Sequence, residues 1–335
     1  MINLQTGIAT AQHFLVDGIC ICCLYLLVLL PSIDDSRVVS VFVLYNVLAF
    51  LTQPLTGHLT DRTRRRHSLL LASVALLALA TLLLAVLLAV ETAPMLTVYC
   101  VPALLGTGNS LFHVWGGKLV AETTANDIRA VGLFVSTGAM GLAVGGVFSS
   151  WVLLFVMLIA FAVLSAVQVS RSALVSVAQP TQHTAPPYRF DRWIEDRLAR
   201  NIGLGLALLV VVGLMLVVML RSMLGELFAK GVPDSSVWPV FLTVGCVSML
   251  GKMAGGWLAR GMGMVSLLAL VVLVSAVCYC FRPANNMSAM LLGLFAVNCT
   301  MPVTLYIAQA VMRGREGLAF GLMAAALIPG YLMAL

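Results

Sequence analysis

The chain has 335 residues, of which 61% are hydrophobic and only 10% are charged. A soluble domain is about 45–50% apolar and about 25% charged, so this composition excludes a water-soluble globule, a disordered chain and a coiled coil. The formal net charge of +6 is no sign of nucleic-acid binding, because in a membrane protein the placement of Lys and Arg matters more than their sum. The composition predicts an integral membrane protein.

The charged residues divide the chain into apolar stretches of the length that crosses a bilayer, about 20 residues. The pattern predicts an all-α polytopic protein with about eleven spans. The uncharged stretch between Arg129 and Arg171 is too long for one helix, so we expect a hairpin that turns near Ser149 and Ser150. The expected spans are 8–30, 38–57, 68–90, 95–118, 129–148, 150–170, 201–228, 237–257, 264–281, 286–310 and 317–335.

The longest polar segment runs from Arg171 to Arg200, and it predicts a boundary between two helix bundles. We expect a six-helix bundle at 1–170, a cytoplasmic linker at 171–199 and a five-helix bundle at 200–335. Most Lys and Arg residues fall in the loops that share the side of the N-terminus. The positive-inside rule therefore predicts a cytoplasmic N-terminus in a plasma or inner membrane.

Two short segments at corresponding places in the two bundles resemble each other. GHLTDRTRRR begins at Gly57 between the second and third spans, and GWLARG begins at Gly256 between the eighth and ninth. Aligning the two glycines also aligns Asp61 with Arg260. We expect Asp61 to cap or pair with a neighbouring helix end, forming a cytoplasmic latch that breaks as the bundles move. The latch residues are Gly57, Asp61, Arg62, Arg65, Gly256 and Arg260.

The segment at Gly57 resembles the signature G-x-L-x-D-R-x-G-R-R of the major facilitator superfamily, with Arg64 in place of the second glycine. The stretch from Gly141 to Gly146 resembles that superfamily's antiporter motif G-P-x-x-G-G, with Leu142 in place of proline. Packing of small residues between helices is the alternative explanation for this stretch. The resemblance implies a two-bundle fold with twelve helices, of which we expect the twelfth to be missing here.

Three segments resemble the fosmidomycin-resistance branch of that superfamily. They are HFLVD from His13, LTQPLTG from Leu51 and GTGNSLFH from Gly106. Val114 and Trp115 stand where that branch has proline and glutamate. The likeness implies efflux as the direction of transport.

Ionisable residues inside the spans are candidates for function, because each costs at least ~2.5 kcal/mol on insertion scales. Asp17 lies well inside the first span, and His13 lies one helical turn earlier on the same face. We expect this pair to couple protons, or alternatively to be a satisfied polar pair between helices. Candidate substrate-binding residues are His113, Arg221, Asn46, Gln53 and Asn298.

Three other cations lie in or near the spans, and for Arg221 two explanations are open. Arg221 points into the bundle if the seventh helix continues to Phe228, and it snorkels to the outer interface if the helix ends at Leu220. Lys118 and Lys252 are expected to snorkel from the cytoplasmic ends of their helices. The eight cysteines lie in apolar segments with no metal-ligand spacing, so we expect no metal site.

These features predict a secondary active transporter of a small organic solute that works by alternating access and is coupled to protons. Uptake of a carboxylate or another nutrient stays open, as does a receptor or partner subunit without transport. No nucleophile elbow, HExxH or phosphate loop indicates an enzyme or a cofactor. We expect a monomer whose partners are substrate, protons and the lipid bilayer, with no nucleic acid.

Overall fold

The computed structural model describes residues 2–31, 33–63, 67–90, 94–174, 203–234, 236–281 and 286–334. Every regular element in these residues is a helix. A bilayer core offers no hydrogen-bond partners to the backbone, and a helix satisfies its N–H and C=O groups internally. Among the described residues, ten helical stretches are long and apolar enough to span a membrane, and the shorter apolar helix Met264–Cys280 corresponds to the ninth predicted span, which completes the eleven. The predicted polytopic all-α fold is confirmed.

The helices of the first half follow the predicted spans. They are α1 (Leu4–Leu27), α2 (Asp35–Asn46), the π-helix η1 (Val47–Leu51), α3 (Gln53–Arg62), α4 (Ser68–Ala89), α5 (Met95–Thr123), α6 (Ile128–Val147) and α7 (Trp151–Leu174). The second predicted span is the continuous helical stretch 35–62, and the hairpin falls between α6 and α7 as expected.

The second half contains two broken spans. Its helices are α9 (Leu204–Lys230), α10 (Trp238–Met262), α11 (Met264–Cys280), α12 (Met287–Asn298), α13 (Met301–Val311), α14 (Glu316–Ala325) and α15 (Leu327–Met333). Proline explains both breaks, because it has no N–H to donate to the carbonyl four residues earlier. Pro302 follows the break between α12 and α13, and Pro329 follows the break between α14 and α15.

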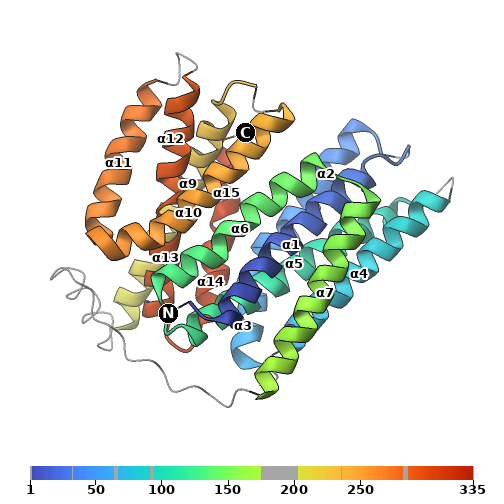
Figure 1. Ribbon diagram of the computed structural model, residues 1–335, viewed down its shortest axis with the longest axis horizontal. Helices are drawn as coiled ribbons and strands as arrows, with labels where there is room; N and C mark the ends of the chain where they lie inside the picture. Colours follow the sequence, from blue (N-terminus) through green and yellow to red (C-terminus); the bar gives the residue numbers. More distant parts are fainter. Residues whose placement is uncertain are drawn as a thin grey trace.

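The helix contacts fall into two groups that meet along a few pairs. In the first half α1 packs on α5, α6 and α7, whereas in the second half α12 packs on α9, α10 and α11. The halves meet where α6 contacts α10 and α13, and where α14 contacts α3 and α5. Figure 1 shows the blue-to-green first half beside the yellow-to-red second half, with α6 and α10 side by side where the halves meet. The predicted linker begins inside α7, and its residues 175–199 lie outside the described ranges.

The outer faces of the helices are apolar. Leu55, Leu96 and Val152 are each at least 75% exposed although they are large hydrophobic side chains. Water would disfavour such exposure, whereas lipid tails are as apolar as leucine. The polar side chains discussed below lie on the opposite, inward faces.

Candidate functional site

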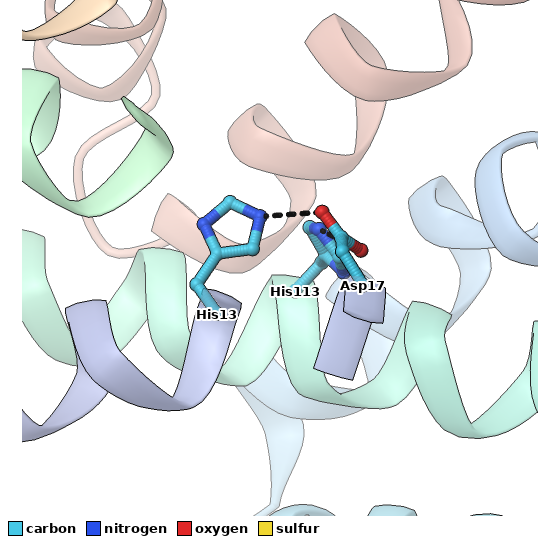
Figure 2. A group of neighbouring side chains, drawn as sticks. All are labelled: His13, Asp17 and His113. Atoms are coloured by element: carbon cyan, nitrogen blue, oxygen red, sulfur yellow. Dashed lines mark ion pairs between the residues drawn. The ribbon is translucent and has the colours of Figure 1, made fainter. Parts of the chain in front are cut away.

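A polar cluster lies at the centre of the first half, on α1 and α5. The Oδ2 atom of Asp17 is 3.3 Å from Nε2 of His13, and its Oδ1 atom is 3.6 Å from Nε2 of His113. Asn109 donates a hydrogen bond from Nδ2 to Oδ1 of Asp17 at 2.9 Å. All four residues are at most 8% exposed. Figure 2 shows the two imidazole rings converging on the carboxylate from different helices.

The hydrogen bonds of the two histidines fix where their protons lie. Nδ1 of His13 is 2.7 Å from the Phe134 carbonyl oxygen, and Nδ1 of His113 is 2.9 Å from the Asn109 carbonyl oxygen. A carbonyl only accepts, so both Nδ1 atoms carry a hydrogen. In neutral rings both Nε2 atoms are then acceptors, yet they face the carboxylate of Asp17. A proton on an Nε2 atom or on the carboxylate is therefore needed for each of these contacts to be favourable.

Glycines on α6 make room for this cluster. A Cβ atom at Gly138 would collide with Oδ2 of Asp17 and would come within 2.6 Å of Nε2 of His13. Gly141 and Gly145 lie against the backbone of α1 at Phe14 and Gly18. The stretch resembling the antiporter motif therefore brings α6 close to α1, as small residues do between membrane helices.

The same cluster has the donor atoms of a metal site. One ligand atom each of His13, Asp17 and His113 lies within 4.8 Å of the others, and the Nδ1 hydrogen bonds are those that orient metal-binding histidines. The charge of Lys252 acts electrostatically on both Asp17 and His113, which disfavours a further cation at the cluster.

Two cations lie inside the second half. α9 continues past Phe228 to Lys230, which places Arg221 inside the helix with 8% exposure. Its Nε atom is buried and has no hydrogen-bond partner among the described residues. Lys252 on α10 is half-buried and lies within electrostatic range of Arg221. α10 continues to Met262, so Lys252 lies ten residues from the end of its helix, further from it than the expected span 237–257 had placed it.

The three amides proposed for substrate binding use their N–H groups within their own helices. Asn46, Gln53 and Asn298 each donate from the side chain to the carbonyl four residues earlier, at 2.8 Å. Asn298 lies beside α10, because a Cβ atom at Gly251 would be 2.9 Å from its Cβ atom. Gln53 is fully buried where α3 meets α14, and its Oε1 atom has no partner in the described part of the chain. Among the described contacts none joins these amides to Asp17.

Two of the predicted latch residues of the first half, Gly57 and Asp61, contact the second half. Oδ1 of Asp61 accepts a hydrogen bond from the N–H of Gly317 at 3.0 Å, and Oδ2 accepts one from the N–H of Leu318 at 2.9 Å. Asp61 also pairs with Nζ of Lys118 at 3.2 Å. Gly57 packs so closely on Gly317 that a Cβ atom would collide with its carbonyl oxygen. Asp61 thus lies at the positive end of α14, where a carboxylate is favoured.

The second copy of the repeat makes a corresponding contact with the roles of the two halves exchanged. Gly256 packs on the backbone of Ile128 and Arg129 at the start of α6, in the first half. Arg260 is half-buried at the end of α10, and Arg62 is exposed at the end of α3. Arg65 lies outside the described residues. Each repeat therefore brings the end of one helix against the beginning of a helix in the other half.

Several site residues have little or no signal in the sequence. Asn109 binds Asp17 across 92 positions, and Gly138 borders the same carboxylate from a third helix. Lys118 reaches Asp61 from α5. Only the polarity of Asn109 and Lys118 inside apolar spans marks them, and nothing in the local pattern marks Gly138 among the glycines of α6.

Two helical halves, joined by close glycine contacts and enclosing a buried ionisable cluster, define a polytopic membrane transporter of the two-bundle type. A sequence model of the Major Facilitator Superfamily matches residues 14–331, and the chain belongs to this superfamily. Its members are transporters and not enzymes, so the chain is a transport protein.

Solved structures of the same fold agree with this assignment. A bacterial homologue of the iron transporter ferroportin, in an outward-facing state, is 13% identical with a TM-score of 0.61, covering 99% of this chain and 91% of that chain. The E. coli fucose:proton symporter is 13% identical with a TM-score of 0.62, covering 97% of this chain and 89% of that chain. At such identities the likeness concerns the fold alone. No functionally curated protein matches the chain by sequence.

Proposed function

We propose that the chain is a proton-coupled secondary transporter that exports a small organic solute by alternating access of two helix bundles, 1–170 and 200–335. The observation that carries the coupling is the hydrogen-bond pattern of His13 and His113, which leaves protons to be shared with Asp17. A buried group that exchanges a proton as the bundles move links proton flow to solute flow.

The conformation supports the alternating-access part of the proposal. On the side predicted to be cytoplasmic, Asp61 holds the start of α14 and Gly256 packs on the start of α6. Both contacts join the two halves, so this side is closed. The structural relatives include outward-facing states, and this chain adopts the corresponding state in our proposal.

The setting of the transporter follows the sequence expectations. It is a monomer of the plasma or inner membrane with a cytoplasmic N-terminus, and it acts on a small molecule. His113, Arg221, Asn46, Gln53 and Asn298 contribute to the substrate pathway, of which His113 touches the proton-sharing carboxylate directly.

Purified protein in liposomes with an internal pH-sensitive dye tests the coupling. Succinate, inorganic phosphate, L-fucose and choline form a panel of anionic, neutral and cationic solutes. We expect at least one of them to drive a proton flux, and Asp17→Asn to abolish that flux while the melting midpoint changes little. Asp234→Asn is the matched control, because Asp234 is exposed and asparagine tolerates its positive φ of 54°.

The outcomes separate the alternatives. Unchanged proton flux in Asp17→Asn would remove this carboxylate from the mechanism. Proton movement in the same direction as the solute would indicate uptake by symport instead of export. Folded protein that binds a solute without moving it would favour the receptor function.

A further inference from the structure

Two cations lie inside helices of the second half, away from the helix ends. Arg221 is nine residues from the end of α9 at Lys230, which is about 13 Å at 1.5 Å per residue. Lys252 is ten residues, or about 15 Å, from the nearer end of α10 at Met262. Neither side chain donates a hydrogen bond to any described residue, and Nε of Arg221 is fully enclosed. Because Arg221 is only 8% exposed, snorkelling to a membrane surface does not explain this arginine.

The charges around this pair do not balance. Among the described carboxylates none acts on Arg221, and its neighbour Lys252 has the same sign. Among the described carboxylates, that of Asp17 acts electrostatically on Lys252. That carboxylate already accepts a hydrogen bond from Asn109 and lies close to two histidines. A buried cation without a partner is unfavourable in a membrane, so this pair indicates a missing anion.

We propose that Arg221 and Lys252 form an oxyanion-binding site, and that the transported solute carries a carboxylate or phosphate group. Arg221 offers a planar fork of donors that matches two oxygens of such a group, and Lys252 on α10 adds a point charge. Lys252 acts electrostatically on both Arg221 and Asp17, so an anion bound here would change the electrostatic field at the Asp17 cluster. This inference rests on the proposed transport function and specifies its substrate class.

Ligand-induced stabilisation of the detergent-solubilised full chain tests the site, because a molecule that binds only the folded protein raises its melting midpoint. The probes are sodium phosphate and sodium succinate, with sodium chloride at matched ionic strength, L-fucose and choline chloride as comparisons. We expect a saturable increase with phosphate, succinate or both, and none with the other three. Phosphate alone and succinate alone distinguish the two kinds of oxyanion.

Charge-removing variants connect the binding to these two residues. Arg221→Gln and Lys252→Gln are expected to raise the half-saturating anion concentration at least tenfold, and Arg221→Lys to raise it less. Lys230→Gln, which removes a charge from the exposed end of α9, is the matched control and should bind like the parent. Without ligand, Arg221→Gln should melt at the same or a higher temperature, because it removes an unpaired buried charge.

A structural role makes the opposite predictions. If Arg221→Gln melts lower than the parent without ligand and binds anions equally well, the arginine supports the fold and the inference is wrong. Equal stabilisation by chloride, or stabilisation only by choline or fucose, also contradicts it. The inference and the transport function fail separately: anion binding without flux in liposomes contradicts transport alone, whereas flux of choline or fucose without anion binding contradicts the anion site alone.

Discussion

Asp61 and Gly317 are 256 positions apart, yet the carboxylate of one accepts a hydrogen bond from the backbone N–H of the other at 3.0 Å. The first turn of α14 leaves its N–H groups without partners inside the helix, and Asp61 satisfies two of them from the other half of the molecule. Lys118 holds the same carboxylate from α5. This contact makes the stability of the closed side depend on one negative charge.

Asp61→Asn should weaken the closed side. The amide keeps one acceptor but loses the charge that the helix end and Lys118 favour, a loss of about 1 kcal/mol. We expect a several-fold increase in hydrogen exchange of the peptide that contains Gly317 and Leu318, measured by mass spectrometry in detergent. Asp234→Asn should leave this exchange unchanged, and equal protection in both variants would show that Asp61 does not hold α14.

Gly138→Ala should disable the proton-sharing cluster without unfolding the bundle. The added methyl group would overlap with the carboxylate of Asp17, so the carboxylate or the ring of His13 must move. We expect the solute-driven proton flux to fall at least tenfold. The control on the same helix is Gly146→Ala, where the nearest atom is a ring carbon of Tyr25 at 3.3 Å. Equal flux in the two variants would contradict a role for the tight packing at Gly138.

Asp127, before the first residue of α6, predicts a dependence of stability on pH. Its carboxylate accepts hydrogen bonds from the backbone N–H and the guanidinium of Arg129. Burial alone would raise the pKa of Asp127, but the hydrogen bonds and charge of Arg129 outweigh it, so the pKa lies below its ordinary value of 3.8. The stabilisation is therefore present above about pH 4, and it is lost as the pH falls through the lowered pKa.

Asp127→Asn isolates this charge, because asparagine is an equally good N-cap. We expect the variant to be less stable by about 0.5–1 kcal/mol at pH 7, a small value because the pair is partly exposed to solvent. The difference in melting midpoint between the two proteins should shrink as the pH is lowered from 7 toward 3. A difference that stays constant with pH would mean that the charge of Asp127 does not contribute.

The sequence predicted the spans well because their signal is local. Twenty apolar residues between charges mark a membrane helix wherever they occur, and the four-residue spacing of His13 and Asp17 places both on one face. The packing of one helix on another has no such local signal. That Asn109 and His113 meet Asp17 depends on the register in which α5 packs on α1, and no local pattern encodes that register.

The position of one side chain along its helix was mispredicted because the predicted end of that helix was wrong. The eighth span was expected to stop at residue 257, before Arg260, which put Lys252 near the surface. α10 instead includes Arg260 and ends at Met262, so Lys252 lies more than one helical turn further from the end of the helix than expected. In the same way α3 continues through Asp61, so this residue lies in the last turn of a helix and not in a loop.

The breaks after Asn298 and Ala325 both fall in the second half. Pro302 and Pro329 cannot donate to the carbonyls of these two residues, so bending at either point costs no helix hydrogen bond. The helix that carries Asp17 is continuous from Leu4 to Leu27. Mechanical compliance therefore lies in these two spans of the second half, and also in the first half at η1, which Pro54 follows, whereas α1 is uninterrupted.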